Sequence, residues 1–153
     1  MAKKNGMIDD LEKNIILALQ DDARKSFKSI AKDIGVSEGT ISNRVNRLME
    51  KGILKLEARV DPFKLQNKVT ALVGLNLHQR FHPEVLKKLQ VLPNVNSVWV
   101  TTGKFDLFME IMADSINDLN DFLFKSDFKK IEEITFTETH IMLHSETKYF
   151  KLE

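Results

Sequence analysis

The stretch SFKSIAKDIGVSEGTISNRVNRLMEKG, residues 26–52, decides the fold of the first third of the chain. Ser26 and Ser37 are typical helix N-caps, and Gly35 and Gly52 stand where helices end, since glycine readily adopts the left-handed conformation. After each serine, apolar residues recur with helical spacing. These residues are Phe27, Ile30, Ala31 and Ile34, and then Ile41, Val45, Leu48 and Met49. The stretch therefore predicts two short helices joined by a tight turn.

The second of these helices has a polar outer face. It carries Glu38, Gly39, Thr40, Asn43, Arg44, Asn46 and Arg47. Any small helical domain has a polar outside, so this face alone decides little. Two further observations favour a helix-turn-helix DNA reader: the spacing of Ala31, Gly35 and Ile41 allows a close helix crossing, and residues 23–60 hold nine Lys or Arg against four Asp or Glu.

The residue types on that outer face match the groups that DNA presents. Arg44 and Arg47 are expected to point into solvent as an accessible cationic ridge that contacts phosphates or guanines. Asn43 and Thr40 are expected to contact base edges, and Ser37, at the helix N-terminus, a phosphate. The full predicted DNA-binding set is Ser37, Gly39, Thr40, Asn43, Arg44, Asn46 and Arg47. Two such helices in a dimer would read an inverted-repeat site in double-stranded DNA.

The flanks of this pair complete a small domain. Leu11, Ile15, Ala18 and Leu19 form one stripe of a helix at 10–22, with acids in its first turn, where the helix dipole favours them. Residues 53–60 alternate as an extended strand, and Asp61-Pro62 ends it. We therefore expect a helix-turn-helix domain at 1–60, a linker at 61–68 and a second domain at 69–153.

In the second domain, the spacing of apolar residues alternates between the period of a strand and the period of a helix. Strands are expected at 69–78, 95–102, 107–113 and 134–143, with a hairpin turn at 103–106. Helices are expected to begin at Pro83 and near Ile116. The order βαββαβ predicts a ferredoxin-like fold, in which two helices cover one face of a four-stranded antiparallel sheet. The fold class of the chain is accordingly α+β.

The strands of this half carry apolar residues on both sides. Leu72, Val98, Val100, Phe108 and Met112 are taken as residues of the face that the two helices leave open. Because a bare apolar sheet face is unfavourable in water, we expect a second subunit to bury it. The chain is then at least a homodimer.

Composition narrows the classes of function. The 153 residues are 42% hydrophobic with a formal net charge of +1, which argues against a polyanion-coating protein. There is no cysteine, so disulfides, thiolate metal sites and cysteine nucleophiles are excluded. No signal sequence and no apolar run of about 18 residues is present. We expect a soluble cytoplasmic protein with no membrane partner, no cofactor and no catalytic residues.

The order and spacing of three motifs resemble the Lrp/AsnC (feast/famine) regulators. They are IAKDIGVSEGTISNRVNRLMEKGIL at 30–54, VDP at 60–62 and TTGKFDL at 101–107. The resemblance implies a transcription regulator whose second half senses a small effector, commonly an amino acid. It also implies a dimer that can assemble into octamers. Members usually carry a glycine soon after VDP, where this chain has Gln66-Asn67, and asparagine tolerates positive φ at some cost.

In that family the effector lies between dimers, close to the hairpin turn. The resemblance thus implies an effector site at Thr102, Gly103, Lys104, Phe105 and Asp106. Gly103 lets the backbone approach a carboxylate, and Asp106 can pair with an α-ammonium. Both residues are equally suited to forming a tight turn. Thr137 and Thr139, on one side of the last strand, are weaker candidates, since threonine also favours strands.

Two alternatives stay open from sequence. One is a ligand-binding or interaction module whose helix-turn-helix half no longer binds an operator. The other is a small metal-binding enzyme on the second half, based on the spacing of His78 with His82 and of His140 with His144. Four residues along a strand span about 13 Å, too far for one ion, so only the first histidine pair remains a candidate. No metal ligands are assigned.

Overall fold

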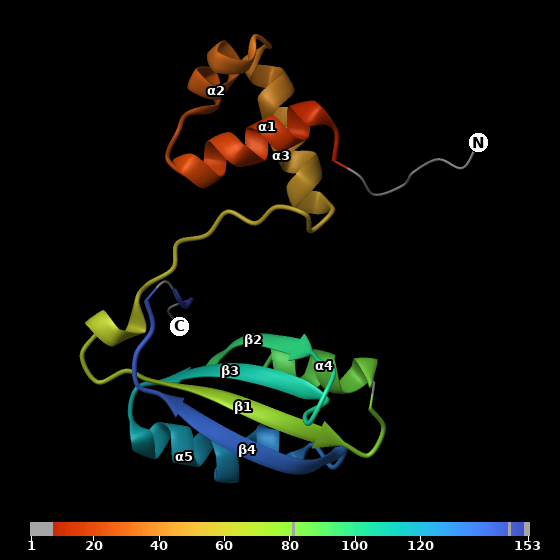
Figure 1. The fold of residues 1–153 in the computed structure, drawn as a ribbon, viewed down its shortest axis with the longest axis vertical. Coiled ribbons are helices and arrows are strands. Elements are labelled where there is room, and N and C mark those ends of the chain that lie inside the picture. The colour runs from red at the N-terminus through yellow and green to blue at the C-terminus, as the bar shows by residue number, and fades with distance from the viewer. Residues whose placement is uncertain (1–7, 81, 147, 152–153) are drawn as a thin grey trace. The chain divides into compact units, whose positions relative to one another are not determined.

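The computed structural model describes the chain except for residues 1–7, 81, 147, 152 and 153 (Figure 1). The chain divides into two compact units, a helical unit that ends at Glu57 and a sheet unit that begins at Ala58. The predicted α+β fold class is confirmed: three helices precede a βαββαβ unit with a four-stranded sheet.

The helical unit consists of α1 (Asp10–Asp21), α2 (Phe27–Ile34) and α3 (Glu38–Glu50). Each begins after a side-chain cap: Asp9, Ser26 and Ser37 accept hydrogen bonds from the backbone amides three residues later. Such caps satisfy amides that a helix leaves unpaired, which explains why the helices start there. The core of the unit is formed by Ile15, Leu19, Ile30, Ala31, Ile41 and Val45.

The turn between α2 and α3 depends on Gly35, whose φ of +83° is left-handed. The amides of Gly35 and Val36 both donate to the Ala31 carbonyl, at 2.9 and 3.0 Å. This pattern closes the end of α2 and lets the chain enter α3 after only a few residues. The predicted helix-turn-helix geometry follows from it.

The connector after α3 differs from the expected strand. Residues 54–59 form no regular element, and the one sheet-type pairing of this stretch is an antiparallel bridge between Val60 and Phe150. Alternating apolar residues favour an extended chain, but a strand also needs a neighbour for its backbone groups, and only Val60 has one. A short 3-10 helix, η1 (Pro62–Lys64), follows. Asn67 then has φ +64°, a conformation that asparagine tolerates.

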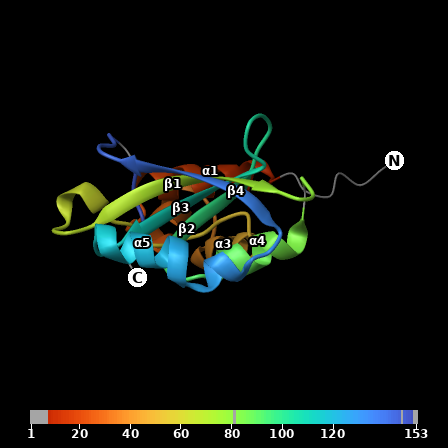
Figure 2. The same ribbon diagram turned by 90° about the horizontal axis from the view of Figure 1, so that it is seen from below.

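The sheet unit contains β1 (Val69–Leu77), β2 (Val95–Val100), β3 (Leu107–Ala113) and β4 (Ile134–Met142) in the spatial order β2-β3-β1-β4. All pairings are antiparallel. The helices α4 (Pro83–Gln90) and α5 (Ile116–Lys125) lie on the same face of the sheet (Figure 2), and η2 (Asp127–Lys130) follows α5.

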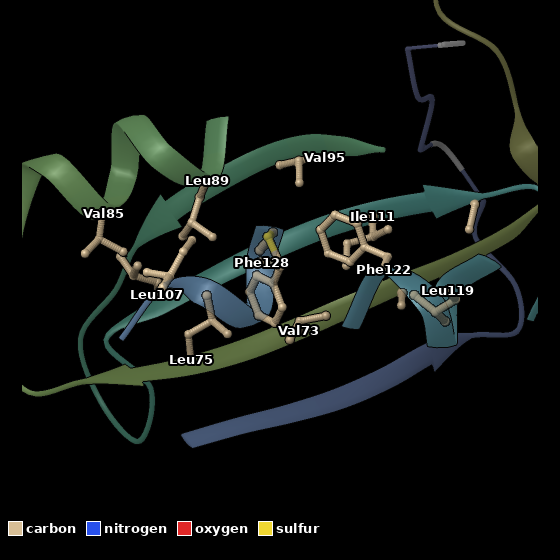
Figure 3. Close-up of a cluster of buried hydrophobic side chains, with 14 of the residues drawn as sticks. Val73, Leu75, Val85, Leu89, Val95, Leu107, Ile111, Leu119, Phe122 and Phe128 are labelled. Atoms are coloured by element: carbon tan, nitrogen blue, oxygen red, sulfur yellow. The ribbon is translucent and has the colours of Figure 1, made fainter. Parts of the chain in front are cut away.

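The core of this unit lies between the sheet and those helices. Figure 3 shows Val85 and Leu89 of α4 and Leu119 and Phe122 of α5 against the strands. The strand residues they meet are Val73, Leu75, Leu107 and Ile111, which alternate along β1 and β3. That alternation is the period of two that identified the strands in the sequence.

The open face of the sheet carries fewer of the expected apolar residues. Val98 and Val100 pair with Met109 and Leu107, both core residues, so they point to the helix-covered face instead. The expectation for these two was wrong because alternation fixes which residues share a face but not which face they choose. Leu72, Phe108 and Met112 do lie on the open face. Trp99 and Phe136 join them there, each nearly half exposed.

Candidate DNA interface and effector site

The N-terminus of α3 presents two hydroxyl groups to solvent. Ser37 Oγ accepts from the Thr40 backbone amide at 3.1 Å and lies 2.8 Å from Thr40 Oγ1. Ser37 is exposed and Thr40 half-buried. The remaining amides of the first turn and the positive end of the helix dipole provide the kind of site where phosphate oxygens bind.

The outermost stripe of α3 consists of Gly39, Asn43 and Asn46. These residues are exposed and lie opposite the buried stripe of Ile41, Val45 and Leu48. Within the described part of the chain, no hydrogen bond or ion pair engages the side chain of Asn43 or Asn46. Their amide groups are therefore available to an external partner.

Arg44 and Arg47 do not form the expected free cationic ridge. Arg44 pairs with Asp9 and lies 3.7 Å from Glu12, while Arg47 donates to Glu12, from Nε at 3.0 Å and also from Nη2. The side chain of Arg44 is 30% exposed and that of Arg47 44%. Arg44 in particular faces α1 rather than solvent. The reason is that α1 begins beside α3 and places two carboxylates within reach of both guanidiniums.

Asp9 and Glu12 hold the two arginines, and sequence reasoning did not identify them. They form a capping box, in which Asp9 Oδ1 accepts from the Glu12 amide at 2.8 Å and Glu12 Oε2 accepts from the Asp9 amide at 3.1 Å. Glu12 is only 4% exposed. An acid followed three residues later by glutamate is a recognisable capping signal, whereas the link to arginines 35 positions later leaves no local trace.

The electrostatics of this cluster favour charged carboxylates. Burial works to raise the pKa of Glu12, but the hydrogen bonds from Arg47 and from the Asp9 amide outweigh it, so the pKa lies below its ordinary value. The Glu12 amide, followed by Arg44, likewise lowers the pKa of Asp9. Both carboxylates are therefore ionised at neutral pH. The cluster joins α1 to α3 and neutralises much of the charge that the two arginines would otherwise offer.

In the sheet unit, the turn between β2 and β3 presents Thr102, Gly103 and Lys104 to solvent. Gly103 has φ +113°, a conformation that side chains rarely allow. The Asp106 carboxylate is already engaged: Oδ2 accepts from the Leu77 amide at 3.0 Å, and Oδ1 lies 3.4 Å from Arg80 Nε. Asp106 thus fixes the turn to the end of β1, which corresponds to the turn-forming role that the sequence left open.

Phe105 anchors the same turn to the open face of the sheet. Its side chain is buried over Gly74, where an added Cβ would lie 2.7 Å from the ring. The Phe136 ring stacks on it with centroids 6.3 Å apart. Lys104 pairs with Glu138 and holds its ammonium 4.7 Å from the Phe105 ring centroid. The hydrogen bond from Lys104 lowers the pKa of the Glu138 carboxyl.

Thr137 and Thr139 share one side of β4, as expected, and both are exposed. They pair with Leu75 and Val73, so they lie on the helix-covered face, whereas Phe105 and Glu138 lie on the other. Within this unit, the structure brings the turn residues together with Glu138. It does not bring them together with the two threonines.

A separate cavity of about 420 Å³ lies at the end of β1. It is lined by His78, Lys88, Lys130, Glu132 and Glu133, none of which is a predicted effector residue. His82 is the N-cap of α4. Across the described residues, no group of three or more potential ligands is arranged to hold a metal ion. Among the helices that the structure describes, none combines the length and apolar character that crossing a bilayer requires.

Comparison with known proteins agrees with both halves of this description. Residues 8–55 match a family model for winged helix-turn-helix DNA-binding, and residues 70–151 match the Lrp/AsnC ligand binding domain. Regulatory protein AsnC of Escherichia coli K12 is 36% identical over 145 residues, covering 93% of this chain and 94% of the relative. The regulator Ptr1 of Methanocaldococcus jannaschii is 37% identical over 118 residues, covering 76% of this chain and 80% of the relative.

The solved structure of E. coli AsnC superposes with a TM-score of 0.71 at 33% identity and covers 93% of this chain and 96% of its own. These relatives are transcriptional regulators, not enzymes. One half of the chain therefore matches a DNA reader and the other half a ligand sensor, in the order found in the relatives. The chain belongs to the Lrp/AsnC family of DNA-binding transcriptional regulators that respond to a small effector.

Proposed function

We propose that this regulator binds an inverted-repeat DNA site as a dimer, with α3 of each subunit in the major groove. The observation that carries the proposal is the exposed polar face of α3, whose amide and hydroxyl groups point away from the core of the unit. An α-helix fits the major groove, and two readers related by a twofold axis meet half-sites about one helical turn apart.

The contacts proposed for each residue follow from its exposure. Ser37 and Thr40, with the amides of the first turn, contact a phosphate, while Gly39, Asn43 and Asn46 face the bases. Arg47 is exposed enough to turn from Glu12 toward a phosphate. Arg44 is more enclosed, and it contributes by holding α3 against Asp9.

The dimer is proposed to form through the open face of the sheet. Trp99 and Phe136 are 41% and 48% exposed there, and Phe108 lies half-buried beside them. Burying these rings against a second copy would remove apolar surface from water. Further assembly of dimers into an octamer would bring the hairpin turn of one dimer against another.

The effector is proposed to be an amino acid bound at Thr102, Gly103, Lys104, Phe105 and Asp106 where dimers meet. The exposed turn supports this, because backbone amides around Gly103 can donate to a carboxylate. The α-ammonium would share the Asp106 carboxylate with Arg80. Thr137 and Thr139 lie on the other face of the sheet, so they would belong to the same site only if a neighbouring subunit supplied them.

DNA binding is tested by selection from a library of randomised duplexes, followed by fluorescence anisotropy of the recovered sequence at several salt concentrations. We expect recovery of an inverted repeat. Arg47→Ala is expected to weaken binding and to lower the slope of log affinity against log salt by about 1, as the loss of one phosphate contact requires. Lys125→Ala, which removes an exposed cation from the sheet unit, is the matched control.

Failure to recover any sequence, together with retention on heparin that modest salt abolishes, would contradict the proposal. It would favour a ligand-binding module without an operator, an alternative to which the pairing of Arg44 and Arg47 with acids lends some support. Effector binding is tested separately, by a thermal-shift screen of the amino acids and by sizing with and without any ligand found.

A further inference from the structure

Gly39 is a glycine that the helical unit itself does not need. It lies in the first turn of α3 without positive φ, and a Cβ built there would meet only Ser37 Oγ, at 3.9 Å. A helix is less stable with glycine than with alanine at an internal position. Because there is free space around Gly39, packing within the helical unit does not explain why α3 carries a glycine there. The requirement for a missing side chain therefore lies outside the unit.

Gly39, Asn43 and Asn46 share one face of α3, because they stand at positions i, i+4 and i+7. At its N-terminal end the stripe has no side chain, which lets another surface approach the helix backbone. Further along, it presents two carboxamides that no described residue occupies. A carboxamide offers a donor and an acceptor side by side, the pattern that matches the N6 and N7 edge of adenine.

The guanidiniums that would recognise guanine are occupied. Arg44 and Arg47 are held by Asp9 and Glu12, and Arg44 lies on the side of α3 that faces α1. Bidentate arginine is the commonest guanine reader, but Arg44 is enclosed beside α1 and Arg47 is proposed to contact a phosphate. The carboxamides of Asn43 and Asn46 are therefore the groups of α3 left to read bases.

We propose that Asn43 and Asn46 read adenines in each half-site, while Gly39 admits the DNA close to the start of α3. This specificity rests on the proposed DNA-binding function and adds to it the base that α3 recognises. Three residues advance a helix by about 4.5 Å, against about 3.4 Å per base pair, so the two adenines lie one or two base pairs apart.

The first test needs no protein variant. Duplexes recovered with the wild-type protein are resynthesised with 7-deazaadenine at one adenine at a time, which removes the N7 acceptor and leaves base pairing intact. We expect two positions per half-site at which affinity falls about 5-fold to 100-fold, and little change elsewhere. An even response across all adenines would overturn the proposal.

The second test assigns the residues. Asn43→Ala and Asn46→Ala are each expected to abolish the preference for adenine over guanine at one position and to retain it at the other. Asn120→Ala, an exposed helical asparagine of the sheet unit, should leave both preferences intact. If both variants keep the wild-type preferences, other groups read the bases and the assignment is wrong.

Gly39→Ala separates folding from contact. An added methyl group has space in the unit and favours the helix, so the thermal midpoint of the helical unit should rise by a few degrees while DNA affinity falls at least several-fold. An increase in stability with unchanged affinity would contradict the role given to Gly39. Recovery of no DNA sequence at all would instead contradict the proposed function, so the two failures are distinguishable.

Discussion

Glu12 is a buried acid, and its carboxylate lies between the start of α1 and two arginines of α3. Removing its charge takes from Arg47 its nearest carboxylate and leaves Asp9 as the acid that both arginines share. Sequence alone could place Glu12 in a helical first turn, and its spacing from Asp9 could have indicated the capping box. The pairing with Arg44 and Arg47 depends on how α1 crosses α3, which no local pattern encodes.

Glu12→Gln should destabilise the helical unit by about 1–2 kcal/mol, less than a fully buried pair, because Arg47 is partly in water. The freed Arg47 should also raise DNA affinity without changing the slope against salt, because it no longer has to leave Glu12 before it contacts its phosphate. Unfolding followed by circular dichroism and anisotropy titrations at several salt concentrations measure the two effects. Asp10→Asn, an exposed acid in the same turn, is the control, and an equal response from it would contradict the prediction.

Stability of the helical unit should fall in acid. The pKa values of Asp9 and Glu12 lie below their ordinary values of 3.8 and 4.5, so the unfolded chain binds protons first as the pH falls. Their contribution is complete above about pH 4.5 and is lost as the pH falls through the folded-state values. The difference between the urea midpoints of the wild type and of Glu12→Gln should therefore begin to shrink as the pH falls below about 4.5, and a constant difference down to pH 3 would contradict this account.

At the scale of elements, the hairpin between β2 and β3 depends on a glycine in a neighbouring strand. Gly74 leaves space for Phe105, which in turn holds the proposed effector turn on the sheet. Gly74→Ala should displace the ring and destabilise the sheet unit by about 1–3 kcal/mol. Trp99, the single tryptophan, lies in this unit and reports its unfolding by fluorescence.

The double variant Gly74→Ala/Phe105→Leu tests the mechanism. If the methyl group and the ring compete for one space, the combined loss of stability should be smaller than the sum of the two single losses. Strictly additive losses would show that Gly74 matters for another reason.

Most element boundaries follow from short-range signals and were predictable. Serine caps before α2 and α3, proline at the start of α4 and glycine after α2 are local chemistry. The errors arose where pairing partners are distant: residues 54–59 lack a neighbouring strand, and Val98 and Val100 take their face from the register with β3. For the effector residues, sequence located the turn but could not show that Asp106 is bonded to Leu77.

At the scale of the whole molecule, the open face of the sheet should determine assembly. Trp99→Asp places a charge among the exposed rings and should convert the dimer into the 17.6 kDa monomer, as sedimentation at micromolar concentration would show. Val91→Asp adds the same charge at the exposed end of α4, and it should leave the dimer intact. A wild-type protein that sediments as a monomer would rule out this interface.

The bridge between Val60 and Phe150 brings the entrance and the final stretch of the sheet unit to one point, through two backbone hydrogen bonds of 2.8 Å. Beside it, Lys148 reaches the buried Glu110 at 2.9 Å and lies 5.0 Å from the Trp99 ring centroid. If a second subunit docks on the open face and displaces Trp99, the displacement would pass through Lys148 and Phe150 to Val60, without involving α4 or α5. A peptide fused just after Phe150 would strain the Val60–Phe150 pairing directly. It should therefore change the response of DNA binding to the effector more than a peptide fused before α1.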